Sequence, residues 1–220
     1  MELGYYSIGE NYGYLIDKAP QNVLEELGQQ INILQSDFSK GVKHNNYLAG
    51  EIQHEYRISP QFQTKQYIKG LSQRFENESQ YMVSNYNPLP TLKFDELWVN
   101  FQKKHEYNPI HNHGGVYSFV IWYQMPFTFE NEIKYHYGSD DGSKCMHGIF
   151  SFIAPNSFSN KRNVVGYSLP IDKSKEGYVA IFPSSLAHMV YPFYSSDDYR
   201  ITVAGNVWDV NMILSQDQLK

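Results

Sequence analysis

The stretch Asn108–His113, with the sequence NPIHNH, decides how this 220-residue chain folds and where its chemistry lies. It stands just before residues 117–124, an aromatic and β-branched run typical of a β-strand. Residues two apart on a strand point to the same face, so His111 and His113 can converge on one point while their neighbours face away. Two convergent imidazoles are the beginning of a site for a divalent metal.

Two further groups follow in the second half of the chain. His188 ends the stretch Phe182–His188 (FPSSLAH), and Arg200 and Thr202 lie two apart on a later strand. A third imidazole from a distant strand would complete a facial set of neutral ligands and leave the opposite positions of the metal open. Arg200 and Thr202 share one face and suit a carboxylate, because a guanidinium fork and a hydroxyl are both donors.

The strand that carries Arg200 is predicted to be interior, because Ile201 and Val203 are apolar. An arginine that points inward from such a strand requires an anionic partner. The alternative is that Arg200 pairs with a surface carboxylate such as Asp197 or Asp198.

The ordered set of these motifs resembles the Fe(II)- and 2-oxoglutarate-dependent oxygenases, which carry His-x-Asp/Glu, a distal His and then an Arg. More closely, it resembles an oxygenase group of tailed phages and marine bacteria. The resemblance covers residues 94–208, and the matching stretches are Trp98–Asn100, Asn108–His113, Ser118–Pro126, Gly177–Pro183 with His188, and Arg200–Asn206. The chain departs from the wider superfamily at His113, where that superfamily has an acidic residue. This departure leaves open whether His113 is a ligand and which metal is native.

The resemblance implies a mainly β fold class: a double-stranded β-helix (jelly roll) of residues 94–210, supported by N-terminal helices. It implies oxidation of an unactivated C–H bond, coupled to decarboxylation of 2-oxoglutarate to succinate and carbon dioxide. The implied cofactor is Fe(II) bound by His111, His113 and His188, and no catalytic residue beyond these ligands is expected. Arg200 would bind the far carboxylate of 2-oxoglutarate, and the other candidates for that pocket are Thr202, Asn100, Ser118 and Asn206.

Two alternatives to this function stay open. A cupin-like protein has the same jelly roll and the same histidine pattern without needing 2-oxoglutarate, although the usual cupin acid is missing from Gly114–Phe119. A virion structural jelly roll would have histidines that bind nothing. The neutral His113 also bears on the metal, because replacing an anionic ligand makes zinc, nickel or copper more competitive with Fe(II).

Composition restricts the class of protein. The net charge is −5, the pI is near 5.9, and the 18 basic residues are scattered, so nucleic-acid binding is not indicated. Cys145 is the single cysteine, which excludes an internal disulfide and favours a reducing compartment. Neither a signal peptide nor a membrane span is predicted, so we expect a cytoplasmic location, in a cell or an infected host. The expected partners are the small-molecule cosubstrate and an unidentified primary substrate, and the oligomeric state is left open.

The period of the hydrophobic pattern divides the chain into two regions of one integrated domain. Residues 1–90 carry two helical stripes, around Leu27 and Leu71, and are predicted to be a helical support region. Residues 91–220 are predicted to be the double-stranded β-helix core. The strands expected there are Leu97–Gln102, Tyr117–Gln124, Gly148–Ile153, Tyr178–Phe182 and Arg200–Trp208.

Two long polar segments interrupt the predicted strands. Thr128–His147 is expected to be a long hairpin or a lid that closes over the substrate, with His136 and His147 as solvated loop histidines. Ser157–Lys175 is expected to be a second, irregular insertion.

Overall fold

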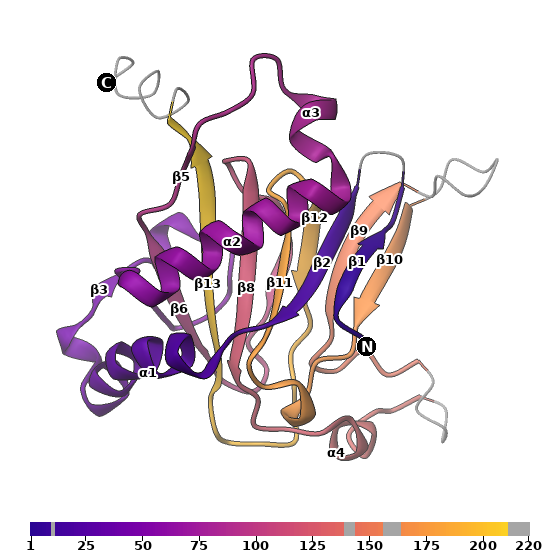
Figure 1. Ribbon diagram of the computed structural model, residues 1–220. Helices are drawn as coiled ribbons and strands as arrows, with labels where there is room; N and C mark the ends of the chain where they lie inside the picture. The colour runs from indigo at the N-terminus through magenta and orange to yellow at the C-terminus, as the bar shows by residue number, and fades with distance from the viewer. Residues whose placement is uncertain (10–11, 139–143, 156–163, 211–220) are drawn as a thin grey trace.

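The computed structural model describes residues 1–9, 12–138, 144–155 and 164–210, which form two β-sheets with helices packed outside the larger one (Figure 1). Within these residues the larger sheet has the strand order β1-β2-β11-β8-β13-β6-β4-β3, and β5 pairs with β13. Its strands are β1 Gly4–Ser7, β2 Gly13–Lys18, β3 Val42–Lys43, β4 His54–Ile58, β5 Leu92–Lys93, β6 Leu97–Gln102, β8 Tyr117–Gln124, β11 Tyr178–Pro183 and β13 Arg200–Asp209.

The smaller sheet has the strand order β10-β9-β12-β7. Its strands are β7 Asn108–His111, β9 Phe150–Pro155, β10 Val164–Leu169 and β12 Ala187–Val190. The helices are α1 Gln21–Ser36, α2 Phe62–Ser79, α3 Tyr81–Asn85 and α4 Phe129–Ile133, with the short 3-10 helices η1 Phe38–Lys40, η2 Asn45–Tyr47 and η3 Lys173–Lys175. No helix in the described part of the chain is both long and apolar enough to cross a membrane.

Alternating side chains of β8 point to opposite faces of the larger sheet, and each face packs in a different hydrophobic core. Phe119 and Ile121 pack in a core shared with α1 and α2. Val120 and Trp122 point the other way, into a core shared with Phe152 of the smaller sheet. Because both faces of β8 are covered, its sequence is a nearly continuous apolar run. The layers are therefore helices, larger sheet and smaller sheet, with β8 near the middle of the larger sheet (Figure 1).

The mainly β fold class with N-terminal helices is confirmed. All five predicted strands are present, and the ends differ by a few residues at most; β9, for example, begins at Phe150 rather than Gly148. The stripes around Leu27 and Leu71 are buried faces of α1 and α2, where both leucines are almost fully covered. The helices close one face of the larger sheet, as an amphipathic helix does.

The structure differs from the sequence prediction in two regions. Residues 1–90 supply strands as well as helices, since β1 to β4 extend the larger sheet at both ends. Strand β2 (GYLIDK) has four consecutive buried residues, and such a short run does not separate a strand from a buried helical turn. In the predicted insertion Ser157–Lys175, residues 164–169 pair with β9 as strand β10. The centre of the predicted lid, residues 139–143, and residues 157–163 of the insertion lie outside the described residues.

Candidate metal centre and anion site

Two of the three candidate ligands face each other across neighbouring strands of the smaller sheet. His111 is the last residue of β7, and His188 is the second residue of β12. The two are register partners in the antiparallel pair, so their side chains lie on the same face. Their ring centroids are 4.3 Å apart.

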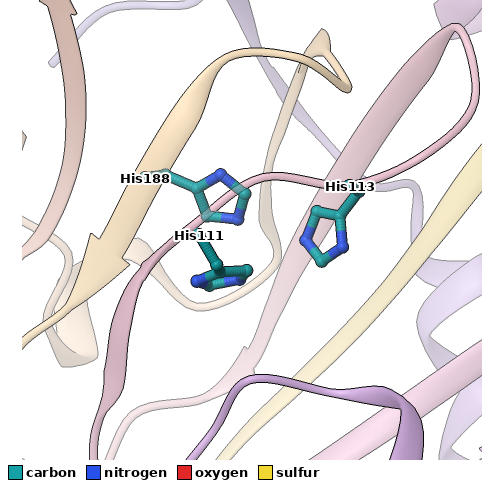
Figure 2. A group of neighbouring side chains, drawn as sticks. All are labelled: His111, His113 and His188. Carbon is teal, nitrogen blue, oxygen red and sulfur yellow. The ribbon is translucent and has the colours of Figure 1, made fainter.

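His113 reaches the same place from the turn after β7. Its backbone N–H donates a 2.9 Å hydrogen bond to the carbonyl oxygen of Ser184, which holds the turn against the segment leading to β12. Its ring centroid is 5.0 Å from those of His111 and His188. One potential ligand nitrogen from each of the three rings lies within 4.8 Å of the others. Figure 2 shows the three rings gathered around one space, as the sequence predicted.

Backbone carbonyls select the tautomer of two of these histidines. His111 Nδ1 lies 2.7 Å from the carbonyl oxygen of Pro109, and His188 Nδ1 lies 3.0 Å from that of Leu186. A carbonyl oxygen only accepts hydrogen bonds, so Nδ1 carries the proton and Nε2 keeps its lone pair. Metal-binding imidazoles usually donate their other ring N–H to a backbone carbonyl or a carboxylate in this way.

The environment keeps all three imidazoles neutral at physiological pH. Burial lowers the pKa of His113 to about 3, with a further contribution from His111. Burial, followed by the other two histidines, also lowers the pKa of His188 well below its ordinary value, and burial lowers that of His111. Neutral rings have the free lone pairs that a cation needs.

Arg200 is buried without an anionic partner. Its side chain is 1% exposed, and Nη1 donates a 3.1 Å hydrogen bond to the carbonyl oxygen of Gly148. Nε has no hydrogen-bond partner, and no carboxylate among the described residues forms a salt bridge with it. Burial lowers the pKa of Arg200 to about 9. The surface alternative is wrong, because exposed Asp197 pairs with Lys104 instead. A buried guanidinium in this state is suited to an incoming anion.

The other predicted cosubstrate residues divide into two groups. Thr202 and Asn100 are register partners on β13 and β6, and Asn100 Nδ2 donates to Thr202 Oγ1 over 3.4 Å. Both line the cavity that also contains the three histidines and Arg200. Ser118 lines this cavity too, but its hydroxyl lies 2.7 Å from Asn206 Oδ1. Among the described residues, Asn206 is not part of the cavity wall, so it supports Ser118 instead of facing a ligand.

Unpartnered polar atoms gather in this cavity. Seven buried side-chain nitrogen or oxygen atoms of the described residues have no hydrogen-bond partner, and four of them belong to residues that line it. Two are donor nitrogens, Arg200 Nε and Trp122 Nε1, and two are oxygens, Asn100 Oδ1 of an amide and Glu55 Oε1 of a carboxyl group. Since buried polar groups are normally satisfied, this concentration indicates a ligand site.

Glu55 is a cavity residue that the sequence analysis missed. It lies on β4 as the register partner of Asn100, and it is fully buried. Its Oε2 accepts a 3.3 Å hydrogen bond from Asn45 Nδ2. Burial, and then the charge of Glu106, raises the pKa of the Glu55 carboxyl to about 8. The sequence predicted only a short extended piece near this point, and an acidic residue on a short strand gives no sign of facing inward.

Comparisons with known proteins agree with this architecture. A family profile described as "Putative 2OG-Fe(II) oxygenase" matches residues 96–206, half of the chain. Among solved structures, a Pseudomonas putida prolyl-4-hydroxylase is similar at 11% identity, with 90% of this chain and 93% of that chain covered and a TM-score of 0.52. EvdMO1 is similar at 15% identity, with 91% of this chain and 48% of that chain covered and a TM-score of 0.53. Comparison with curated proteins finds no matching sequence.

At these identities the structural neighbours show the fold, and the predicted double-stranded β-helix is confirmed. The affiliation with phages and marine bacteria stays a prediction. The matched residues include the three clustered histidines and the unpaired Arg200. The family description names Fe(II) and 2-oxoglutarate, which are the cofactor and cosubstrate predicted from the sequence. The chain belongs to the 2OG-Fe(II) oxygenase family.

Proposed function

We propose that this protein is a dioxygenase that uses Fe(II) and 2-oxoglutarate to hydroxylate, or otherwise oxidise, a C–H bond of an unidentified substrate. One observation carries the proposal: three neutral imidazoles and a buried, unpaired guanidinium line the same cavity. The imidazoles suit a cation and the guanidinium suits a carboxylate, and an oxygenase of this family needs both.

His111, His113 and His188 are the proposed metal ligands. The carbonyl oxygens of Pro109 and Leu186 leave Nε2 of His111 and His188 free to coordinate, which supports the assignment. Three protein ligands would leave coordination positions of the ion for the cosubstrate. His113 contributes no negative charge, so the ion would retain its full 2+ charge until 2-oxoglutarate binds.

Arg200 is proposed to hold the far carboxylate of 2-oxoglutarate, with Thr202 as a second donor. The guanidinium has a fixed fork geometry that matches a carboxylate, and its Nε still lacks a partner. Trp122 Nε1 is another unpartnered donor in the same wall. The bound iron and 2-oxoglutarate supply the oxidation of the C–H bond by dioxygen, with succinate and carbon dioxide as coproducts. The protein's own residues fix the geometry and keep water away.

The aromatic walls support this role. Phe150 and Phe182 line the cavity and pack against His188, with ring centroids 5.5 and 5.0 Å from its ring. Trp98 packs against His113 at 5.6 Å. Apolar neighbours restrict the rotation of the imidazoles and exclude water from the site, which strengthens electrostatic interactions inside it.

Calorimetry under anaerobic conditions, with Mn(II) in place of Fe(II), tests the proposal. The wild-type protein should bind metal and then one equivalent of 2-oxoglutarate. His188→Ala should lose both, and Arg200→Met should keep the metal and lose 2-oxoglutarate. Arg57→Met is the matched control, because Arg57 is exposed and pairs with Glu96.

The two alternatives make different predictions in the same experiment. A metal-loaded protein that does not bind 2-oxoglutarate would support the cupin-like alternative. A wild-type protein that binds no metal would support the virion jelly roll. Production of succinate by the aerobic, Fe(II)-loaded protein, and its loss in Arg200→Met, would support the oxygenase.

A further inference from the structure

A second group of metal-binding side chains lies where the chain passes between α4 and β9. His136 follows α4, and Cys145 and His147 precede β9. One potential ligand atom of each lies within 4.8 Å of the others, and the two imidazole centroids are 5.6 Å apart. The sequence predicted solvated loop histidines here, whereas all three side chains are partly buried. None of the three lines the cavity described above.

His147 is held as a metal ligand would be. Its Nδ1 lies 3.3 Å from the carbonyl oxygen of Glu132, so this nitrogen carries the proton and Nε2 keeps a lone pair. The Glu132 carboxylate is 3.8 Å from the same Nδ1 and is itself fixed by the backbone N–H groups of Tyr194 and Ser195, both at 2.8 Å. A carboxylate behind an imidazole increases the basicity of the ligating nitrogen.

The other two side chains have unused coordinating atoms. His136 Nε2 is buried and has no hydrogen-bond partner among the described residues. Cys145 is a free thiol, and as the single cysteine of the chain it has no partner for an internal disulfide. A bound cation would use these atoms, and it would convert the thiol to a thiolate.

We propose that His136, Cys145 and His147 form a second metal site, for zinc or a similarly thiophilic divalent ion. Thiolate and imidazole are both donors that zinc uses in proteins, and a set with one thiolate is softer than the all-nitrogen set of the cavity. The fourth position of a tetrahedral ion would be filled by water. The thiolate and the buried Glu132 carboxylate offset the charge of the ion. The ion would link the segment that follows α4 to the segment that precedes β9, as a structural metal does.

Such an ion would also stabilise the backbone beside the proposed cosubstrate site. Gly148 follows His147 directly, its carbonyl accepts the hydrogen bond from Arg200, and its N–H donates to the carbonyl oxygen of Pro192 at 2.8 Å. Its φ is +70°, and an added Cβ would lie 2.4 Å from the ring of Phe127, so only glycine fits there. This positioning role rests on the proposed function, whereas the metal site itself does not.

Cobalt(II) titration of the reduced full-length protein tests the site by absorption spectroscopy. The cavity ligands contain no sulfur, so a thiolate-to-cobalt charge-transfer band reports on Cys145 alone. Zinc affinity is measured in parallel by competition with a chromophoric chelator. The cluster variants are Cys145→Ser, His136→Gln and His147→Gln. His111→Ala perturbs the cavity without touching the cluster, and exposed His105→Gln is the matched histidine control.

The wild-type protein is expected to show the band and to bind a second equivalent of zinc. For each cluster variant, the affinity for that second equivalent of zinc should fall about 100-fold or more, since changing a group that only hydrogen-bonds to a ligand already reduces metal affinity about 10–100-fold. His111→Ala and His105→Gln should keep the band. Circular dichroism of the metal-free variants checks that they fold. The absence of the band in reduced wild-type protein, or its persistence in both histidine variants of the cluster, overturns the proposal.

Discussion

Replacing Arg200 by methionine should make the metal-free protein more stable and much weaker in binding 2-oxoglutarate. The guanidinium is buried without an anion, and its pKa falls from 12.5 to about 9. One pKa unit corresponds to ~1.4 kcal/mol, so the unfavourable free energy of burying this charge is roughly 5 kcal/mol. Methionine removes that term but loses the hydrogen bond to Gly148, a charged bond worth about 1.5–3 kcal/mol. The net gain in the free energy of unfolding is therefore roughly 2–4 kcal/mol.

The pH dependence gives this prediction a second signature. Arginine is a base whose pKa is lowered on folding, so the folded state binds its proton less tightly than the unfolded state does. The stability of the wild-type protein should therefore rise as the pH increases from about 9 toward 12.5. Arg200→Met lacks this titration, so its stability advantage over the wild type should shrink as the pH rises above about 9.

Urea unfolding of the metal-free proteins, without 2-oxoglutarate, measures the stability difference. Calorimetry with Mn(II) measures cosubstrate affinity, which should fall by about 2–5 kcal/mol, or roughly 30- to 5,000-fold. Arg200→Lys should restore only part of the affinity, because an ammonium lacks the bidentate fork. If Arg200→Met lowers stability and binds 2-oxoglutarate as the wild type does, Arg200 is a structural residue and the reasoning is refuted.

Three further perturbations test other parts of the site. His113→Ala should lower Mn(II) affinity in calorimetry about as much as His111→Ala does. His113→Asp should keep the metal and favour Fe(II) over zinc, because it adds an anionic oxygen ligand. Unchanged metal affinity in His113→Ala would mean that water fills the third coordination position. Glu55→Gln should raise the free energy of unfolding at pH 7 by up to about 3 kcal/mol. The folded state raises the pKa of the Glu55 carboxyl to about 8, so the wild-type protein loses stability as the pH rises from the ordinary pKa of the group toward 8. Urea unfolding at about pH 5 and pH 7.5 checks this, and an equal effect at both would contradict it. Gly115→Ala should destabilise the protein by ~1–3 kcal/mol, because the φ of Gly115 is +96° and the added Cβ would lie 2.9 Å from the carbonyl oxygen of Val207. An unchanged melting temperature would show that alanine causes no backbone strain at this position.

The sequence was sufficient for those features that depend on local pattern. β6 and β8 have the predicted bounds, because polar Glu96 and Lys103 flank β6 and the turn-forming residues Gly115 and Pro126 stand close to the ends of β8. Strand alternation predicted that His111 and His113 converge, and they do, but His113 reaches the site from the turn after β7 and not from the strand itself. The convergence of His188 with them came from the family resemblance, since nothing in the local pattern pairs β12 with β7.

Features that depend on distant packing could not be predicted. Glu55 faces the cavity because β4 pairs with β6 far along the chain, and no local period indicates that pairing. Asn206 was expected to face the cosubstrate. Its side-chain oxygen instead accepts a hydrogen bond from the Ser118 hydroxyl within the larger sheet. His136 follows α4 and His147 precedes β9, and no local period indicates that their side chains come together.

The unsatisfied atoms of the cavity also have an order that follows the sheet. Trp122 and Arg200 lie on neighbouring strands β8 and β13, and both present unpartnered donors. Asn100 and Glu55 lie on the next two strands, β6 and β4, and present an unpartnered amide oxygen and an unpartnered carboxyl oxygen. A buried polar atom without a partner is unfavourable by about 1–3 kcal/mol, so stability alone would not retain four of them in one wall. Proteins break such local rules mainly at functional sites, where a ligand supplies the missing partners. The donor side is complementary to the carboxylate of 2-oxoglutarate, and Asn100 Oδ1 is complementary to a hydrogen-bond donor, a group that 2-oxoglutarate with its carboxylates ionised does not have.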